Sequence, residues 1–183
     1  MLLILVPLWG ALVAPGVPSF RQVPDSTVLR RYGDAVNATA DTLDMLRGMA
    51  QAFRNDLQTA SPTIILARAT SVQSACASGV SSIRRLQGML AARTISTIPL
   101  AVRDQAKFRT TSEETVAALE RCVRSWQPLP RTDDRADTLR SWGPYRVNEI
   151  AQALHKFDGA RAAFVNSAGL PGRPVVLPPH ANP

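Results

Sequence analysis

Apolar side chains recur at alternating steps of three and four residues along most of this chain, which is the spacing of α-helices that pack in a bundle. The first such run extends from about Asp25 to Thr59. Its apolar stripe consists of Leu29, Tyr32, Val36, Thr39, Leu43, Leu46, Ala50, Phe53 and Leu57. Asp and Arg side chains fall between these positions, so the pattern predicts one long helix with a buried face and a solvated face.

Two further helices are predicted, one before and one after Pro99. Ser61 followed by Pro62 is a strong helix start, and this helix is expected to fade through residues 94–97. Its apolar stripe consists of Ile65, Ala69, Val72, Cys76, Gly79, Ile83, Leu86 and Leu90. The helix after Pro99 is predicted to stop before Pro128. Its stripe is Ala101, Phe108, Thr115, Leu119, Cys122 and Trp126, and Gln105 and Ser112 interrupt it.

A fourth helix is predicted from about Pro144 to Ala168, followed by Gly169 as its C-terminal glycine. Its stripe consists of Val147, Ile150, Leu154, Phe157, Phe164 and Ala168. Arg161 interrupts the stripe, so its side chain must reach solvent or an acid. Residues 128–143 are expected to form a connection that contains one short helical turn beginning at Thr132. Gly143-Pro144 should separate that turn from the fourth helix.

Four helices with two short connections predict an all-α fold, an up-down-up-down four-helix bundle over residues 21–169. Residues 1–20 contain no charged side chain. They have the character of a signal peptide, and an uncleaved membrane anchor is the alternative. Residues 170–183 are rich in proline and are expected to form an extended tail.

Cys76 and Cys122 lie at equal sequence distances before and after Pro99, and each falls on an apolar stripe. In an antiparallel hairpin the two sulfurs reach the same height, which predicts a disulfide; two buried free thiols are the alternative. A disulfide implies an oxidising compartment and therefore export. The arginines that follow the apolar leader (Arg21, Arg30 and Arg31) favour a cytoplasmic body instead, and we give the cysteine pair more weight.

The net charge is +7 and rests on arginine, because Lys107 and Lys156 are the only lysines. A GC-rich genome explains this composition, and so does a surface that prefers anionic partners such as lipid head groups, acidic proteins or nucleic acid. The expected export argues against nucleic acid.

Three regions are candidate docking surfaces. On the helix after Pro62, the small side chains of Ser71, Ser74, Ala75 and Ser78 recur at helical spacing, with Arg84 and Arg85 as a basic rim. Small side chains let another helix approach closely, although burial within the chain's own bundle explains them as well. Trp126, Trp142 and Tyr145 flank the 128–143 connection and suit either packing at the bundle end or a partner contact. The proline-rich tail is the third region.

No catalytic template is present: the sequence has no phosphate-binding loop, no H-E-x-x-H and no G-x-S-x-G motif. Neither a metal nor a cofactor is expected. A haem held by His155 with Met45, Met49 or Met89 is the weaker interpretation, because a partly exposed helical histidine explains the same residue.

Two hypotheses of function follow. The first is an exported, membrane-tethered or membrane-associated, non-enzymatic helical subunit, accessory or structural, that docks onto other protein subunits of a larger membrane complex. Residues 1–20 would be its contact with the membrane, and its body would be extracytoplasmic. The second is a soluble periplasmic four-helix bundle that binds a small ligand, haem or metal.

Overall fold

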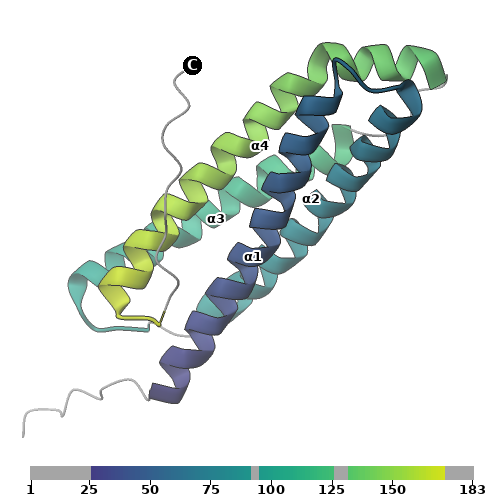
Figure 1. Ribbon diagram of the computed structural model, residues 1–183. Helices are drawn as coiled ribbons and strands as arrows, with labels where there is room; N and C mark the ends of the chain where they lie inside the picture. The colour runs from purple at the N-terminus through teal and green to yellow at the C-terminus, as the bar shows by residue number, and fades with distance from the viewer. Residues whose placement is uncertain (1–25, 92–94, 126–131, 172–183) are drawn as a thin grey trace, which may run out of the picture.

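The computed structural model describes residues 26–91, 95–125 and 132–171, and the side chains of the last range from residue 135 onward. These ranges contain four helices and no strand: α1 (Ser26–Asp56), α2 (Pro62–Ala91), α3 (Pro99–Ser125) and α4 (Thr132–Ala168), shown in Figure 1. The prediction of an all-α, four-helix fold is confirmed. The apolar leader (1–20), Trp126 and the tail from residue 172 lie outside the described residues.

Contacts along α1 and α2 show that these two helices run antiparallel. Arg68 Nε donates to Asp56 at 2.9 Å, beside the turn at residues 57–61. At the opposite end, the Tyr32 hydroxyl donates to the Met89 carbonyl at 3.2 Å. We refer to the end that holds residues 57–61 as the α1–α2 end. The end that holds residues 95–98 and the start of α1 is the α2–α3 end.

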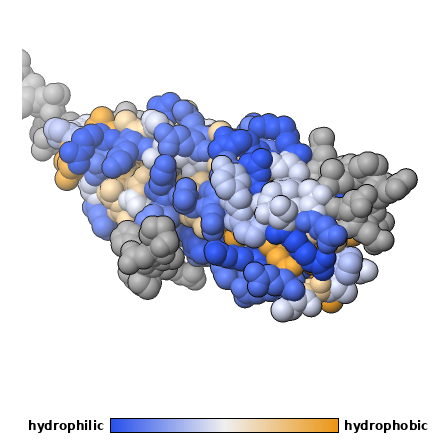
Figure 2. All heavy atoms as spheres, turned by 90° about the horizontal axis from the view of Figure 1, so that it is seen from above, coloured by the Kyte–Doolittle hydropathy of each residue, from blue (hydrophilic) through white to orange (hydrophobic). Residues whose placement is uncertain are grey.

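The apolar stripes predicted from the sequence form the core. The members within the described residues are buried, apart from Leu29 and Ala168, which are half-buried and pack against it. The aromatic rings of α3 and α4 meet at its centre, where the Phe108 ring lies 5.1 Å from that of Phe157 and 5.4 Å from that of Phe164. Hydrophilic side chains cover most of the face drawn in Figure 2, with hydrophobic areas between them.

Polar side chains on the stripes are hydrogen-bonded or ion-paired inside the bundle. Gln105 accepts from the Ile95 amide at 3.2 Å and donates to the Leu90 carbonyl at 3.3 Å, which holds α3 to the chain that follows α2. Arg161 is buried, and its Nε lies 3.6 Å from the carboxylate of Asp158. The expectation that Arg161 must reach an acid or solvent is therefore confirmed.

The expected break at Gly143-Pro144 is wrong. A single helix, α4, continues through both residues from Thr132 to Ala168. Pro144 lacks the amide proton of a helical hydrogen bond, which favours a bend rather than an end, and α4 changes direction after its first turns in Figure 1. A Cβ at Gly143 would lie 3.1 Å from Leu57, so glycine permits the close approach of α4 to the end of α1.

The C-terminal end of α4 is fixed by Gly169. This residue has a φ of 63°, its amide donates to Asn166, and the amide of Leu170 donates to Val165. The two bonds form a Schellman motif, which confirms the C-terminal glycine that the sequence predicts. Leu170, which the sequence analysis assigned to the tail, is buried in the core, so the bundle extends beyond residue 169.

Candidate functional site

A groove of about 380 Å³ opens between α1 and α2. Four of the predicted docking residues on α2 line it, together with side chains of α1 that the sequence analysis did not assign to docking. The lining consists of Thr42, Met45, Met49, Thr70, Ser71, Ser74, Ala75 and Ser78. Ser71, Ser74 and Ser78 are exposed and Ala75 is half-buried, so this face of α2 is accessible.

The groove is chemically more apolar than its hydroxyl residues suggest. Thr42, Thr70 and Ser71 each donate their hydroxyl proton to the carbonyl oxygen four residues earlier, at 3.0 Å in each case. These protons are therefore already used within the helices, and the side chains present mainly carbon to a partner. Met45 is 64% exposed and adds a flexible thioether that can adapt to an incoming surface.

The two predicted rim arginines lie on different sides of α2. Arg84 pairs with Glu120 and therefore faces α3 rather than the groove. Arg85 follows Ser78 by one heptad, so it lies on the groove side of the helix, beyond the lining residues. Of the two predicted rim arginines, Arg85 therefore lies beside the groove and Arg84 does not.

Trp142 and Tyr145 lie on the first half of α4, not on a loop. Trp142 is half-buried and packs against the core, whereas Tyr145 is exposed. The guanidinium carbon of Arg146 lies 5.8 Å from the Trp142 ring centroid and 5.7 Å from that of Tyr145, within cation–π range of both.

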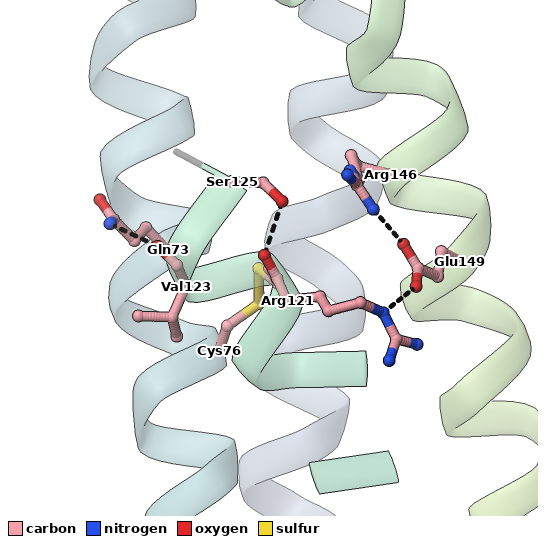
Figure 3. The surroundings of a disulfide bond; sticks show 8 residues. Gln73, Cys76, Arg121, Val123, Ser125, Arg146 and Glu149 are labelled. Atoms are coloured by element: carbon pink, nitrogen blue, oxygen red, sulfur yellow. Dashed lines mark hydrogen bonds and ion pairs between the residues drawn. A yellow bond between two sulfur atoms is a disulfide. The ribbon is translucent and has the colours of Figure 1, made fainter. Parts of the chain in front are cut away.

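Arg146 also begins a chain of charges that joins α4 to α3 (Figure 3). Glu149 accepts from Arg146 and from Arg121, at 2.7 Å in each case. Burial raises the pKa of the Glu149 carboxyl, but the hydrogen bonds and charges of the two arginines outweigh it, so its pKa lies below the usual value. These residues hold the carboxylate ionised and cross-link the two helices.

The Cys76–Cys122 pair lies beside this charge chain (Figure 3). The sulfurs are 2.11 Å apart and the Cα atoms 6.3 Å apart, so the two cysteines stand at disulfide distance on facing helices. Both are buried. Gln73 donates to the Val123 carbonyl at 2.9 Å, which holds α2 and α3 together around the sulfurs.

The candidate haem ligands are not assembled around one site. Met45 and Met49 line the α1/α2 groove, and His155 is on α4, which contributes no residue to that groove. Within residues 26–91, 95–125 and 132–171, His, Cys, Asp and Glu form no group of three or more that could hold a metal ion.

The described parts of the predicted docking regions lie at different heights along the bundle. The groove lies near the middle of α1 and α2, and Trp142 precedes Gly143, which contacts the end of α1. Pro171 contacts Gly33 near the start of α1. Gly33 and Leu57 are separated by about 36 Å of helix rise, so Pro171 and Gly143 lie at opposite ends of α1.

None of the helices in the described part of the chain combines the length and the apolar character needed to cross a membrane.

The sequence contains a signal for the α1 side of the groove. Met45 and Met49 are four residues apart and off the apolar stripe, so they share one side of the helix that the core does not use.

Comparison of the chain with protein-family models, with curated proteins and with solved structures gives no match.

Proposed function

We propose that this chain is an exported, membrane-associated, non-enzymatic accessory or structural subunit that docks onto a larger membrane protein assembly through the α1/α2 groove. The proposal includes an up-down-up-down order of the four helices, an extracytoplasmic body, and attachment to the membrane by residues 1–20. The observation that carries it is the groove itself, where exposed methionines of α1 face small side chains of α2.

The chemistry of the groove suits a helix of another protein. Small side chains at positions 71, 74, 75 and 78 let a second backbone come close. Met45 and Met49 can adjust their rotamers to fill the space that remains, which favours a packed contact over a hydrogen-bonded one. The buried cysteine pair supports an oxidising location, because such pairs persist outside the reducing cytosol.

Bulky substitutions in the groove test the docking step. Ser78→Trp fills the groove, whereas Ala77→Trp places the same side chain at the neighbouring exposed position, which does not line it. The full chain and both variants are extracted from native membranes in mild detergent and separated on a native gel. We expect the wild type and Ala77→Trp to migrate in one large stoichiometric assembly and Ser78→Trp to leave it.

Equal assembly of all three proteins would show that the groove is not the docking surface. A wild-type protein that migrates near its own mass, without residues 1–20, would contradict the subunit hypothesis. That outcome would favour the second hypothesis, a soluble bundle that binds a small ligand, haem or metal, and an absorption spectrum of the purified protein would then test for haem.

A further inference from the structure

The α2–α3 end exposes large apolar side chains that the core does not use. Ile98 is 52% exposed and Leu100 is 50% exposed, and Val102 is exposed on the next turn. They occupy the first turn of α3 and the residue before it, where the chain reverses between α2 and α3. Isolated apolar residues are common on protein surfaces, but a group at the tip of a bundle marks an interaction site.

Exposed cations share this end of the bundle with the apolar tip. Residues 26–34, 88–91, 95–107 and 164–171 make up the α2–α3 end. Its charged residues are the cations Arg30, Arg31, Arg103 and Lys107 and two acids, the exposed Asp34 and Asp104. Asp104 is buried and pairs with Arg103 at 3.0 Å. Arg30, Arg31 and Lys107 are exposed, and none of them forms an ion pair with any residue that the structure describes.

The starts of α1 and α3 lie at the same end of the bundle. Tyr32 of α1 bonds to the Met89 carbonyl, and Gln105 of α3 bonds to the Leu90 carbonyl, so both lie close to the end of α2. The apolar and basic side chains therefore come from different helices at the same end. A broad partner surface can reach them together.

The chain that precedes α1 joins the bundle at this same end, because α1 begins at Ser26. The sequence of residues 1–20 contains no charged side chain. Apolar side chains that share an end face with exposed cations match an anionic lipid surface, which offers hydrocarbon below a layer of negative head groups. Nucleic acid offers the negative charge without the hydrocarbon.

We propose that the α2–α3 end face binds the surface of an anionic bilayer, so that the bundle stands upright on the membrane. Ile98, Leu100 and Val102 insert between the lipids, and Arg30, Arg31 and Lys107 contact the head groups. This surface is separate from the α1/α2 groove and needs no protein partner, so it can be tested independently of the docking proposal.

Vesicle sedimentation of the full chain tests the charges. The vesicles are phosphatidylcholine with and without phosphatidylglycerol, at low and high salt. Each neutralised cation is expected to weaken partitioning about fivefold, so Arg30→Gln with Arg31→Gln lowers it by about 25-fold on anionic vesicles only. The matched control is Arg68→Gln with Arg124→Gln, which removes the same charge from surfaces outside this end face.

The apolar tip is tested in the same assay. Ile98→Ser with Leu100→Ser is expected to weaken binding about tenfold through lost insertion. Ile64→Ser, which changes a similarly exposed side chain at the α1–α2 end, should leave binding within twofold. All variants keep residues 1–20, so any contribution of that segment is common to them. Urea midpoints equal to that of the wild type establish that the variants are folded.

Orientation gives an independent readout. A fluorophore on Leu100→Cys should be quenched by brominated lipids in anionic vesicles, and the same fluorophore on Ile64→Cys should not. Equal quenching at the two positions would overturn the proposal. Equal vesicle binding by the variants at the two ends would overturn it as well. Binding that depends on Arg30 and Arg31 but not on Ile98 and Leu100 would also overturn it, and would indicate a polar polyanion as the partner.

Discussion

The two ends of the bundle use the same kind of side chain in opposite ways. At the α1–α2 end, Arg140 donates to the carbonyl oxygens of Leu57 and Ala60, both at 3.2 Å, and so closes the C-terminal end of α1. At the α2–α3 end, Arg30 and Arg31 have no ion-pair partner among the described residues. Arginine therefore stabilises the fold at one end and is left available at the other.

The position of the acids causes this difference. α2 contains no Asp or Glu along its whole length, and the α2–α3 end holds two acids, the exposed Asp34 and the buried Asp104. The net charge of +7 gives the excess of cations but not the distribution of their partners. The ion pairs decide which part of a basic protein can act as an electrostatic surface.

Removal of the disulfide should have the largest effect on stability. The double variant Cys76→Ala with Cys122→Ala opens a loop of about 45 residues, and we expect the free energy of unfolding to fall by about 4 kcal/mol. The C-terminal end of α3 should lose its protection first, because Gln105 still holds the start of α3 at the α2–α3 end. Urea unfolding and amide exchange measure both effects.

The wild type after reduction and refolding serves as the control for the double variant, and both should have the same urea midpoint. If the oxidised and reduced proteins unfold at equal urea concentrations, the sulfurs are not bonded in solution and the pair consists of buried thiols.

Disruption of the contact between Pro171 and Gly33 should have the next largest effect on stability. A Cβ at Gly33 would lie 2.5 Å from the carbonyl oxygen of Pro171, so Gly33→Ala forces backbone apart and should destabilise the protein by about 2 kcal/mol. Gly48→Ala is the matched control in the same helix. Its Cβ would meet nothing within 4 Å, so helix propensity should stabilise it by about 1 kcal/mol. Thermal melts that move in the same direction would contradict this assignment.

Removal of one cation from each end of the bundle should have a smaller effect on stability. Arg140→Met removes two donors from the carbonyls that end α1 and should cost about 1–2 kcal/mol of stability. Lys107→Met removes an exposed cation that has no ion pair within the described residues and should change stability by less than about 0.5 kcal/mol. Equal urea midpoints for the two variants would show that Arg140 does not brace the α1–α2 end.

The sequence was sufficient to predict the helices and the residues that face the core. The steps of three and four residues report a local property, because each stripe position is fixed by the geometry of its own helix. This holds even for Gln105 and Ser112, which are polar but buried, since both satisfy their hydrogen bonds with nearby backbone. The pairing of Cys76 with Cys122 could also be predicted, because each lies on an apolar stripe and at the same sequence distance from Pro99.

The course of α4 and the groove could not be predicted in this way, because both depend on neighbours distant in sequence. Gly143 and Pro144 are a local signal for the end of a helix. α4 nevertheless continues through both residues, where Gly143 lies against Phe53 of α1 and against Leu57. The groove needs Met45 of α1 beside Ser74 of α2, and no pattern within either helix specifies that pairing. The cations at the α2–α3 end could be counted in the sequence, but only the fold shows that Arg30, Arg31 and Lys107 form no ion pair within the described residues.

The smallest expected effect is a pH dependence that belongs to the ion-paired part of the molecule. The pKa of Glu149 is lowered in the folded state, because Arg121 and Arg146 outweigh its burial, so the carboxylate contributes stability above its unfolded pKa. That contribution should be lost as pH falls through the folded pKa, which lies below the usual glutamate pKa of 4.5. Glu149→Gln removes the titration, so its urea midpoint should fall less than that of the wild type between neutral and acid pH. Parallel pH profiles for wild type and variant would show that Glu149 does not couple α3 to α4.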